Sequence, residues 1–391
     1  MSVAITSVGV VTGFGVGLEQ SVNALLRGEC AIRPVTRFPT AGLCSSVASE
    51  APEDAALVAA ASEYSPAPAT DRASRLLLAA FADAAQGRIL EPTTRRGVVV
   101  GTTKGALERA APAWQRGVIP AEDFLGSPAR ALASASKSRG PVFTMGAACA
   151  SSAVALGEAL MLINEGACDE VLVGGTEALH PFLYEGFHAL KALSAVAAKP
   201  FDAARNGLSL GEGAGVLFVE SLAHAQRHGR IPLVLVEGFG SAVLGMDQTT
   251  PDPAGLGLLA ACRRALTNAE VAAETIDRYH AHGTGTVQND AMEAAVHRSL
   301  FGSRPVPVCA IKGAIGHTLG ASGALDIATC AETLRREVLP PIVNLLQLDA
   351  SARVPAVMGS ARRSTGTLAL VASAGFGGIN TALVLRRPEG A

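Results

Sequence analysis

A cysteine and two histidines, each in a turn of small residues, are the side chains of this sequence that could act together chemically. Cys149 lies in the segment TMGAACASS, directly before residues 150–163, which are strong helix formers. His282 lies in AHGTGT and His317 lies in IKGAIGHTLGASG, and each follows an expected strand. A thiol nucleophile with two imidazoles is sufficient for acyl transfer through a thioester. The imidazole Nε2–H groups can stabilise developing negative charge, and backbone N–H groups can form an oxyanion hole.

The position of Cys149 at the start of a helix predicts an activated thiol. Unpaired backbone N–H groups and the positive end of the helix dipole favour the thiolate, so we expect a pKa below the usual value of about 8.5. The small neighbours also allow a sharp turn that exposes the sulfur. The alternative is a cysteine that only fills the core, which is the commoner role of a cysteine among alanines. Either histidine, taken alone, could equally have an ordinary structural role.

Lys312 and Glu293 are the charged residues expected to support the histidines. Lys312 stands five residues before His317 in an otherwise small and apolar segment, and Glu293 lies in NDAMEAAV on an expected helix. Lys312 could fix the histidine network in a pair with Glu293; the alternative for both is a solvated surface position. His280, two residues before His282, is expected to lie in the core or behind the site.

The elements that must position these turns occur twice in the same order. Residues 98–105 (VVVGTTKG) are echoed by residues 279–286 (YHAHGTGT), and residues 141–163 are echoed by residues 305–334. The further matches are residues 3–15, 169–178 and 213–220 with residues 232–243, 368–378 and 379–386. The expected strands are continuous Val/Ile/Leu runs, as in sheets covered on both faces. A repeated βαβ-type order predicts an α/β fold of two similar halves.

The duplication places Cys149 and His317 in equivalent strand-to-helix turns. In a pseudo-symmetric fold such turns can face one another across the axis, which would bring the two side chains together. We divide the chain into residues 1–235, with the nucleophilic cysteine, and residues 236–391, with the two catalytic histidines. Neither half is expected to be an independent domain.

The composition indicates a large buried core and excludes several classes of protein. Of 391 residues, 49% are hydrophobic and only 17% are charged, which suggests that part of the surface is buried against another subunit. The net charge is −2 with no basic tract, which argues against a nucleic-acid partner. The seven cysteines form no CxxC and no zinc-type spacing with histidines, so no metal is expected. No basic leader and no uncharged run of ~18 residues occurs, so we expect a cytoplasmic protein and no membrane partner.

Four segments together resemble the β-ketoacyl-acyl carrier protein synthases. GAACASS, AHGTGT, KGAIGHTLGASG and GFGGIN occur in that family's order and approximate spacing, and PFDAARNGLSLGEGAG is also similar. The similarity runs from about residue 3 to residue 386. It implies a thiolase-like, duplicated five-layer αβαβα fold and a dimer. It further implies an acyltransferase of the elongating ketosynthase type, in fatty-acid or in specialised polyketide or aryl-polyene-type biosynthesis.

The resemblance also implies roles for individual residues. Cys149 would accept the acyl chain, and His282 and His317 would bind the carbonyl of malonyl-acyl carrier protein and stabilise the enolate formed as carbon dioxide leaves. Lys312 and Glu293 match the family's supporting lysine and acid. The remaining matches are Phe376, as a gate whose N–H would share the oxyanion hole with that of Cys149, and Thr284 and Thr286, which would line the phosphopantetheine tunnel. No dissociable cofactor is implied, because the pantetheine arm belongs to the acyl carrier protein.

Two other functions on the same fold compete with this interpretation. A degradative thiolase would need a second reactive cysteine in a late turn, where this sequence has AGFGGIN. A chain-length-factor-like partner subunit of a heterodimeric ketosynthase usually lacks the nucleophile, whereas this chain keeps Cys149 and both histidines. The chain departs from the family's pattern in shorter segments at 189–202 and 40–55 and in His280, where asparagine is frequent. The acyl primer, the product length and the identity of the second subunit are therefore left open.

Overall fold

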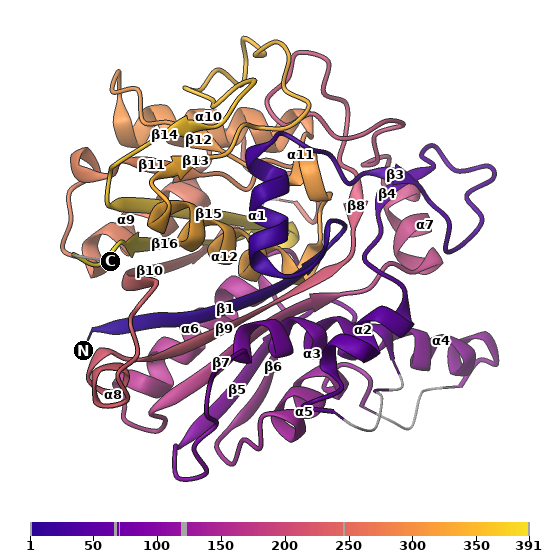
Figure 1. Cartoon of the computed structure of the whole chain (residues 1–391). Helices are drawn as coiled ribbons and strands as arrows, with labels where there is room; N and C mark the ends of the chain where they lie inside the picture. Colours follow the sequence, from indigo (N-terminus) through magenta and orange to yellow (C-terminus); the bar gives the residue numbers. More distant parts are fainter. Residues whose placement is uncertain (1, 66–68, 70, 119–122, 245–246, 390–391) are drawn as a thin grey trace.

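The computed structural model describes residues 2–65, 69, 71–118, 123–244 and 247–389 (Figure 1). The strands of the first half are β1 (Val3–Thr12), β2 (Gly15–Val16), β3 (Arg33–Pro34), β4 (Val47–Ser49), β5 (Arg96–Gly101), β6 (Val142–Met145), β7 (Glu170–Glu177), β8 (Leu210–Gly211) and β9 (Gly213–Ser221). Its helices are α1 (Leu18–Leu26), α2 (Asp54–Ala61), α3 (Arg72–Ala85), α4 (Leu107–Gln115), α5 (Ser127–Ala135), α6 (Ser151–Asn164), α7 (Pro181–Ala189) and α8 (Leu222–Arg227).

The second half repeats this alternation of strands and helices. Its strands are β10 (Val234–Val243), β11 (Arg278–His280), β12 (Val308–Cys309), β13 (Val338–Leu339), β14 (Arg362–Arg363), β15 (Leu368–Gly375) and β16 (Ile379–Arg386). Its α-helices are α9 (Leu256–Asn268), α10 (Val287–Phe301), α11 (Lys312–Ile315) and α12 (Ser322–Arg335). Short 3₁₀ turns are η1 (Ala273–Thr275), η2 (Leu319–Ala321) and η3 (Phe376–Gly378).

The order of the strands confirms the duplication. One continuous sheet runs β6-β5-β7-β9-β1 and then β10-β16-β15-β11-β12, so that each of these five strands of the first half has its predicted counterpart at the mirrored position. The two halves join where β1 pairs antiparallel with β10, with Val3 opposite Val236. The long central strands β5, β7 and β9 are buried along their whole length, as their uninterrupted apolar runs predict.

Helices cover the sheet in layers. On one side α3 packs against β1, β7 and β9, with α2 and α5 beside it, and α9 packs against β10 and β16 in the other half. Between the two halves lie α6 and α12, which contact each other and strands of both halves (Figure 1). The strands of each half therefore form one layer between their own outer helices and the central pair α6 and α12. The layers run helix, half-sheet, helix, half-sheet, helix, as the sequence resemblance implies.

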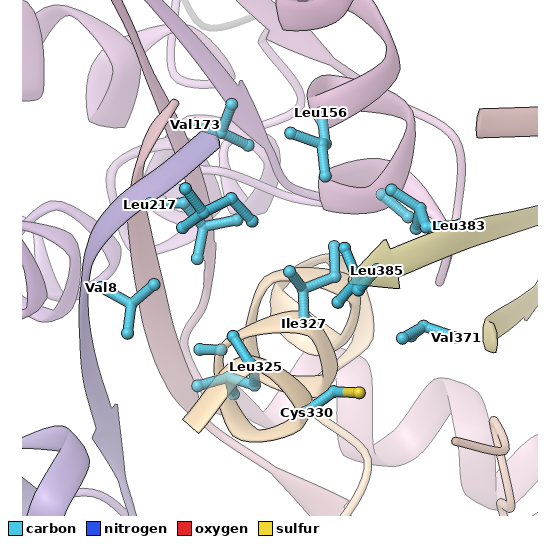
Figure 2. Packing of buried hydrophobic residues seen from close by; sticks show 14 of the residues in the cluster. Val8, Leu156, Val173, Leu217, Leu325, Ile327, Cys330, Val371, Leu383 and Leu385 are labelled. Atoms are coloured by element: carbon cyan, nitrogen blue, oxygen red, sulfur yellow. The ribbon is translucent and has the colours of Figure 1, made fainter. Parts of the chain in front are cut away.

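The central core is formed where α6 and α12 pack between the two halves. Leu156 from α6 and Leu325 and Ile327 from α12 lie among side chains of the surrounding strands, such as Val173 and Leu383 (Figure 2). Burial of this apolar surface is the main source of stability for the arrangement.

Small residues let the two central helices approach closely. A Cβ placed on Gly323 would lie 2.6 Å from the backbone nitrogen of Ala153. The backbone N–H of Ala324 donates to Ser152 Oγ at 2.9 Å, so the start of α12 is tied to the start of α6. The predicted proximity of the two equivalent strand-to-helix turns is thereby confirmed.

The segments outside the two repeated units form smaller structures. Strands β3, β4 and β8 make a separate three-stranded sheet, and β13 pairs with β14. Across the described ranges, none of the helices is both long enough and apolar enough to cross a membrane.

Candidate active site

A strained turn presents Cys149 at the end of β6. Ala148, the residue before it, has φ 47°, a left-handed conformation that is rare for residues with a side chain. Ser151 holds this turn from the first residue of α6: its Oγ accepts from the N–H of Ala147 at 2.9 Å and donates to the carbonyl of Ala148 at 2.6 Å. The sharp turn predicted for Cys149 is therefore present, and α6 begins within a residue of the expected start.

Gly101, at the end of β5, leaves the space that the turn after Cys149 needs. A Cβ at this position would lie 2.2 Å from the backbone nitrogen of Ser152. We expect Gly101→Ala to lower the free energy of unfolding by about 1–3 kcal/mol through overpacking. Since the displaced backbone belongs to the turn of Cys149, thioester formation should slow by about 10²-fold.

Denaturant unfolding and the rate of thioester formation measure both effects. Gly186→Ala is the matched control, because a Cβ on this glycine of α7 would meet nothing within 4 Å. Its unfolding midpoint should equal or exceed that of the wild type. A Gly101→Ala variant with wild-type stability and rate would show that the close approach is not required.

Cys149 is buried, with 5% of its surface exposed, so the expectation that the turn exposes the sulfur to solvent is wrong. Burial raises its pKa to about 11, although the charge of Lys312 and the backbone N–H of Phe376 lower it. The expectation of a pKa below the usual value is wrong for the resting site, because the loss of hydration outweighs the stabilisation that the helix start and the nearby cation provide. The thiol is therefore the resting form, and its proton must leave as the sulfur reacts.

The two histidines meet at the same site. The rings of His282 and His317 lie 5.2 Å apart between centroids and nearly perpendicular, at 86°. Burial lowers the pKa of both, to about 3 for His317, and the charge of Lys312 lowers both further. Both rings are therefore neutral near pH 7 and can act as hydrogen-bond donors without carrying a positive charge.

The ring nitrogens differ in their partners. His317 Nδ1 lies 3.0 Å from Ser322 Oγ at the start of α12. When this serine donates to Nδ1, the proton of the ring is on Nε2. His282 Nδ1 is buried and has no hydrogen-bond partner among the described residues.

Glu293 holds the turn that carries His282. Its carboxylate, on α10, accepts from the backbone N–H of His282 at 2.8 Å and of Gly283 at 2.7 Å, and from Asn289 Nδ2 at 2.9 Å. Burial, together with the charge of Asp290, raises its pKa to about 7, although the two backbone N–H groups and the charge of Lys312 lower it. Glu293 is therefore a buried support of the site and not a solvated helix residue.

The carboxylate partner of Lys312 is Asp326, not Glu293. Lys312 is buried, and its Nζ donates to Asp326 Oδ2 at 2.9 Å. The predicted pair of Lys312 with Glu293 is therefore wrong: α12 carries Asp326 to the ammonium group, while Glu293 is used by the turn of His282. Sequence reasoning missed Asp326, although an acid in the apolar stretch SGALDIATCAETL was a visible signal.

The last strand-to-strand turn closes the site from the other side. The backbone N–H of Phe376 lowers the pKa of the Cys149 thiol, and Ser373 Oγ donates to the Cys149 carbonyl at 3.5 Å. The Phe376 ring stacks on Phe187, 5.9 Å between centroids, a neighbour that sequence reasoning did not single out. Phe376 thus acts on the thiol through its backbone N–H, while its ring packs on Phe187.

A single cavity connects these groups. It has a volume of about 340 Å³ and is lined by Cys149, His282, His317, Phe376, Thr284 and Thr286 among others. The hydroxyls of the two threonines lie 3.0 Å apart. The structure therefore brings the predicted nucleophile, both histidines, the gate and the two threonines to one cavity, with Lys312 and Glu293 behind it.

The chain belongs to the β-ketoacyl synthase family. Residues 1–225 match its N-terminal domain and residues 233–346 match its C-terminal domain. The chain is 32% identical to the tetracenomycin polyketide synthase ketoacyl synthase alpha subunit of Streptomyces glaucescens, over 99% of this chain and 97% of that protein. It is also 32% identical to 3-oxoacyl-[acyl-carrier-protein] synthase 2 of Rhizobium meliloti, over 99% of each.

A solved structure confirms the fold. The ishigamide ketosynthase/chain length factor superposes with a TM-score of 0.90 at 29% identity, covering 99% of both chains. The fold is thus the thiolase-like ketosynthase fold that the sequence resemblance implied.

Proposed function

We propose that this chain is a β-ketoacyl-[acyl carrier protein] synthase that condenses a Cys149-bound acyl chain with malonyl-acyl carrier protein. The observation that carries the proposal is the single cavity that holds Cys149, His282 and His317. A relative named as a 3-oxoacyl-[acyl-carrier-protein] synthase supports the choice of carrier protein.

The reaction begins with transfer of the acyl group. The Cys149 sulfur attacks the thioester of the donor, a new sulfur–carbon bond forms, and the carrier leaves with a free thiol. The oxyanion of the tetrahedral intermediate accepts hydrogen bonds from the backbone N–H groups of Cys149 and Phe376. The Phe376 N–H already lowers the pKa of the Cys149 thiol in the resting site.

Carbon–carbon bond formation follows on the second substrate. Malonyl-acyl carrier protein loses carbon dioxide, and the electron pair of the broken bond forms an enolate whose oxygen accepts from Nε2–H of His282 and His317. The enolate carbon attacks the Cys149 thioester and expels the Cys149 thiolate. Neutral imidazoles suit this task, because they donate hydrogen bonds in a buried site where charged rings would be strongly destabilised.

The pantetheine arm of the carrier enters past Thr284 and Thr286, which line the cavity. We include no metal and no dissociable cofactor, because the reactive thioesters come with the substrates.

A second ketosynthase-like subunit pairs along the free end of the sheet. Strand β6 is the last in the sheet order, and Val142 and Phe143 on it are 39% and 42% exposed. An apolar strand edge of this kind is suited to pairing with another chain. The ketosynthase/chain length factor supports an assembly of two ketosynthase-like chains, and the partner here is either a second copy or such a factor.

The pathway and the location of the enzyme are also part of the proposal. The alpha-subunit relative points to polyketide assembly and the synthase 2 relative to fatty-acid synthesis. We place the enzyme in the cytoplasm. We keep the boundary between the nucleophile half and the histidine half at residues 235 and 236, which are the second and third residues of β10.

Removing His317 should separate the two half-reactions. In His317→Ala, decarboxylation of malonyl-acyl carrier protein should fall by about 10²–10³-fold, the cost of a lost oxyanion donor. Acyl transfer to Cys149 should fall less than tenfold, because that step uses the backbone donors. Carbon dioxide release and the mass gain on Cys149 measure the two steps on the same sample.

The comparison has clear outcomes. If acyl transfer falls as far as decarboxylation, the assignment of His317 to the enolate is wrong. If the wild-type chain, with and without an added chain length factor, neither accepts an acyl group nor releases carbon dioxide, the proposed function fails and a non-catalytic partner role is favoured.

A further inference from the structure

Asp326 lies between two basic side chains. Its Oδ2 accepts from Lys312 Nζ at 2.9 Å, and its Oδ1 lies 3.2 Å from His280 Nε2. All three side chains are buried, with at most 2% of their surfaces exposed. A carboxylate of this kind can accept from both neighbours at once, because each of its oxygens faces a different donor.

The surroundings of His280 favour a ring with protons on both nitrogens. Its Nδ1 lies 3.9 Å from Cys309 Sγ on β12. Contacts with Asp326, Cys309 and Cys330 hold its pKa well above the usual range, even though burial lowers it. Its own strand also carries Arg278, whose guanidinium donates to the carbonyls of Val338 and Ser364 and interacts electrostatically with Cys309 and Cys330. The adjacent strand β15, with the sequence LALVASAG, contains no titratable residue.

The charge of the cluster depends on His280. Lys312 and Asp326 alone sum to zero, whereas a protonated His280 makes the sum +1. The charge of Lys312 lowers the pKa values of Cys149, His282 and His317. The cluster is therefore close enough to the reacting groups to influence their charge states. In a buried site such a charge is screened far less than in water.

We propose that His280 is a positioning residue for the condensation. Its ring is an imidazolium that binds Asp326 on the side opposite Lys312. The buried cluster Lys312–Asp326–His280 then has a net positive charge, which favours the Cys149 thiolate. This role deepens the proposed function and rests on it, because the thiolate matters only if Cys149 accepts the acyl chain. The role is electrostatic, through Asp326, and involves no contact with substrate.

The test is the rate of Cys149 alkylation by iodoacetamide at pH 8, followed by mass spectrometry of the peptide that contains Cys149. At this pH, well below the pKa of the thiol, the rate is proportional to the fraction of thiolate. His280→Gln keeps a neutral hydrogen-bond donor and removes the charge. Its alkylation should be about 3–10-fold slower than that of the wild type, which corresponds to a pKa of Cys149 raised by about half a unit to one unit. His280→Asn, with the residue frequent at this position in the family, should also be slower.

His297→Gln is the matched control. His297 is also buried in the second half, but its Nε2 pairs with the carbonyl of Val306. This variant should keep the wild-type rate of alkylation. A wild-type rate in either folded His280 variant, or an equal slowing in His297→Gln, would overturn the proposal.

Two readouts keep the proposal separate from the proposed function and from simple misfolding. Alkylation needs no carrier protein, so slower alkylation of the His280 variants, in a chain that accepts no acyl group, would support the electrostatic role and reject the synthase. In the wild-type protein labelled with ¹⁵N-histidine, one ring absent from the His280→Asn spectrum should carry both protons at pH 8. A singly protonated His280 there would refute the proposal, whatever the stability of the variants.

Discussion

Cys149→Ala is expected to accept no acyl group from any acyl-carrier protein, while the wild type gains the mass of one acyl group. Condensation should fall by at least about 10⁴-fold, because the covalent intermediate cannot form. The fold should survive, since the substitution removes one buried sulfur atom and alanine already occupies positions 147, 148 and 150. Stability should stay within about 1 kcal/mol of the wild type. Intact-protein mass spectrometry over a panel of acyl donors measures the transfer.

Cys262→Ala provides the control for this experiment. Cys262 is fully buried in α9, and burial raises the pKa of its thiol, so it should be inert. That variant should accept the acyl group as the wild type does. Normal condensation by Cys149→Ala would contradict the assignment of the nucleophile. The donor that loads the wild type fastest would identify the preferred primer.

Asp326→Asn is expected to destabilise the protein and to slow condensation together. Asparagine leaves the buried Lys312 ammonium without its charged acceptor, which typically costs about 3–5 kcal/mol. A displaced lysine would also disturb both histidines, so condensation should fall at least about tenfold. Denaturant unfolding at constant pH gives the loss of stability, and a coupled condensation assay gives the loss of rate.

A double variant separates these two effects. Lys312→Met with Asp326→Leu removes both charges and replaces them with apolar groups of similar size, while His280 can release its proton. Most of the stability lost in Asp326→Asn should return, but activity should not. If the double variant also regains activity, Lys312 has only a structural role. If Asp326→Asn is as stable as the wild type, the buried pair Lys312–Asp326 does not contribute to the free energy of unfolding.

The fold could be predicted well because the signal was repeated. Each strand run in the first half had a second copy in the same order, and β5 with β11 and β7 with β15 indeed occupy mirrored places in the sheet. The duplication also predicted the meeting of Cys149 and His317, since equivalent turns lie at the starts of adjacent central helices.

The chemistry behind the cavity was less predictable. Spacing along the chain could not decide which acid reaches Lys312, because that depends on how α12 sits against the turn before it. Nor could it give the degree of burial of Cys149, which reverses the expected direction of the pKa. The contact between His280 and Asp326 was also not predictable, because it is tertiary packing and not the local sequence pattern that brings the two side chains together.

The bond between Ala324 and Ser152 joins residues 172 positions apart. Contacts of such long range form late, because a large loop must close before they contribute any stability. Cys149 is also synthesised before His282 and His317, so during synthesis the thiol exists for a time without its histidines. The order of assembly gives the cell a nucleophile that becomes competent only when the whole polypeptide has folded.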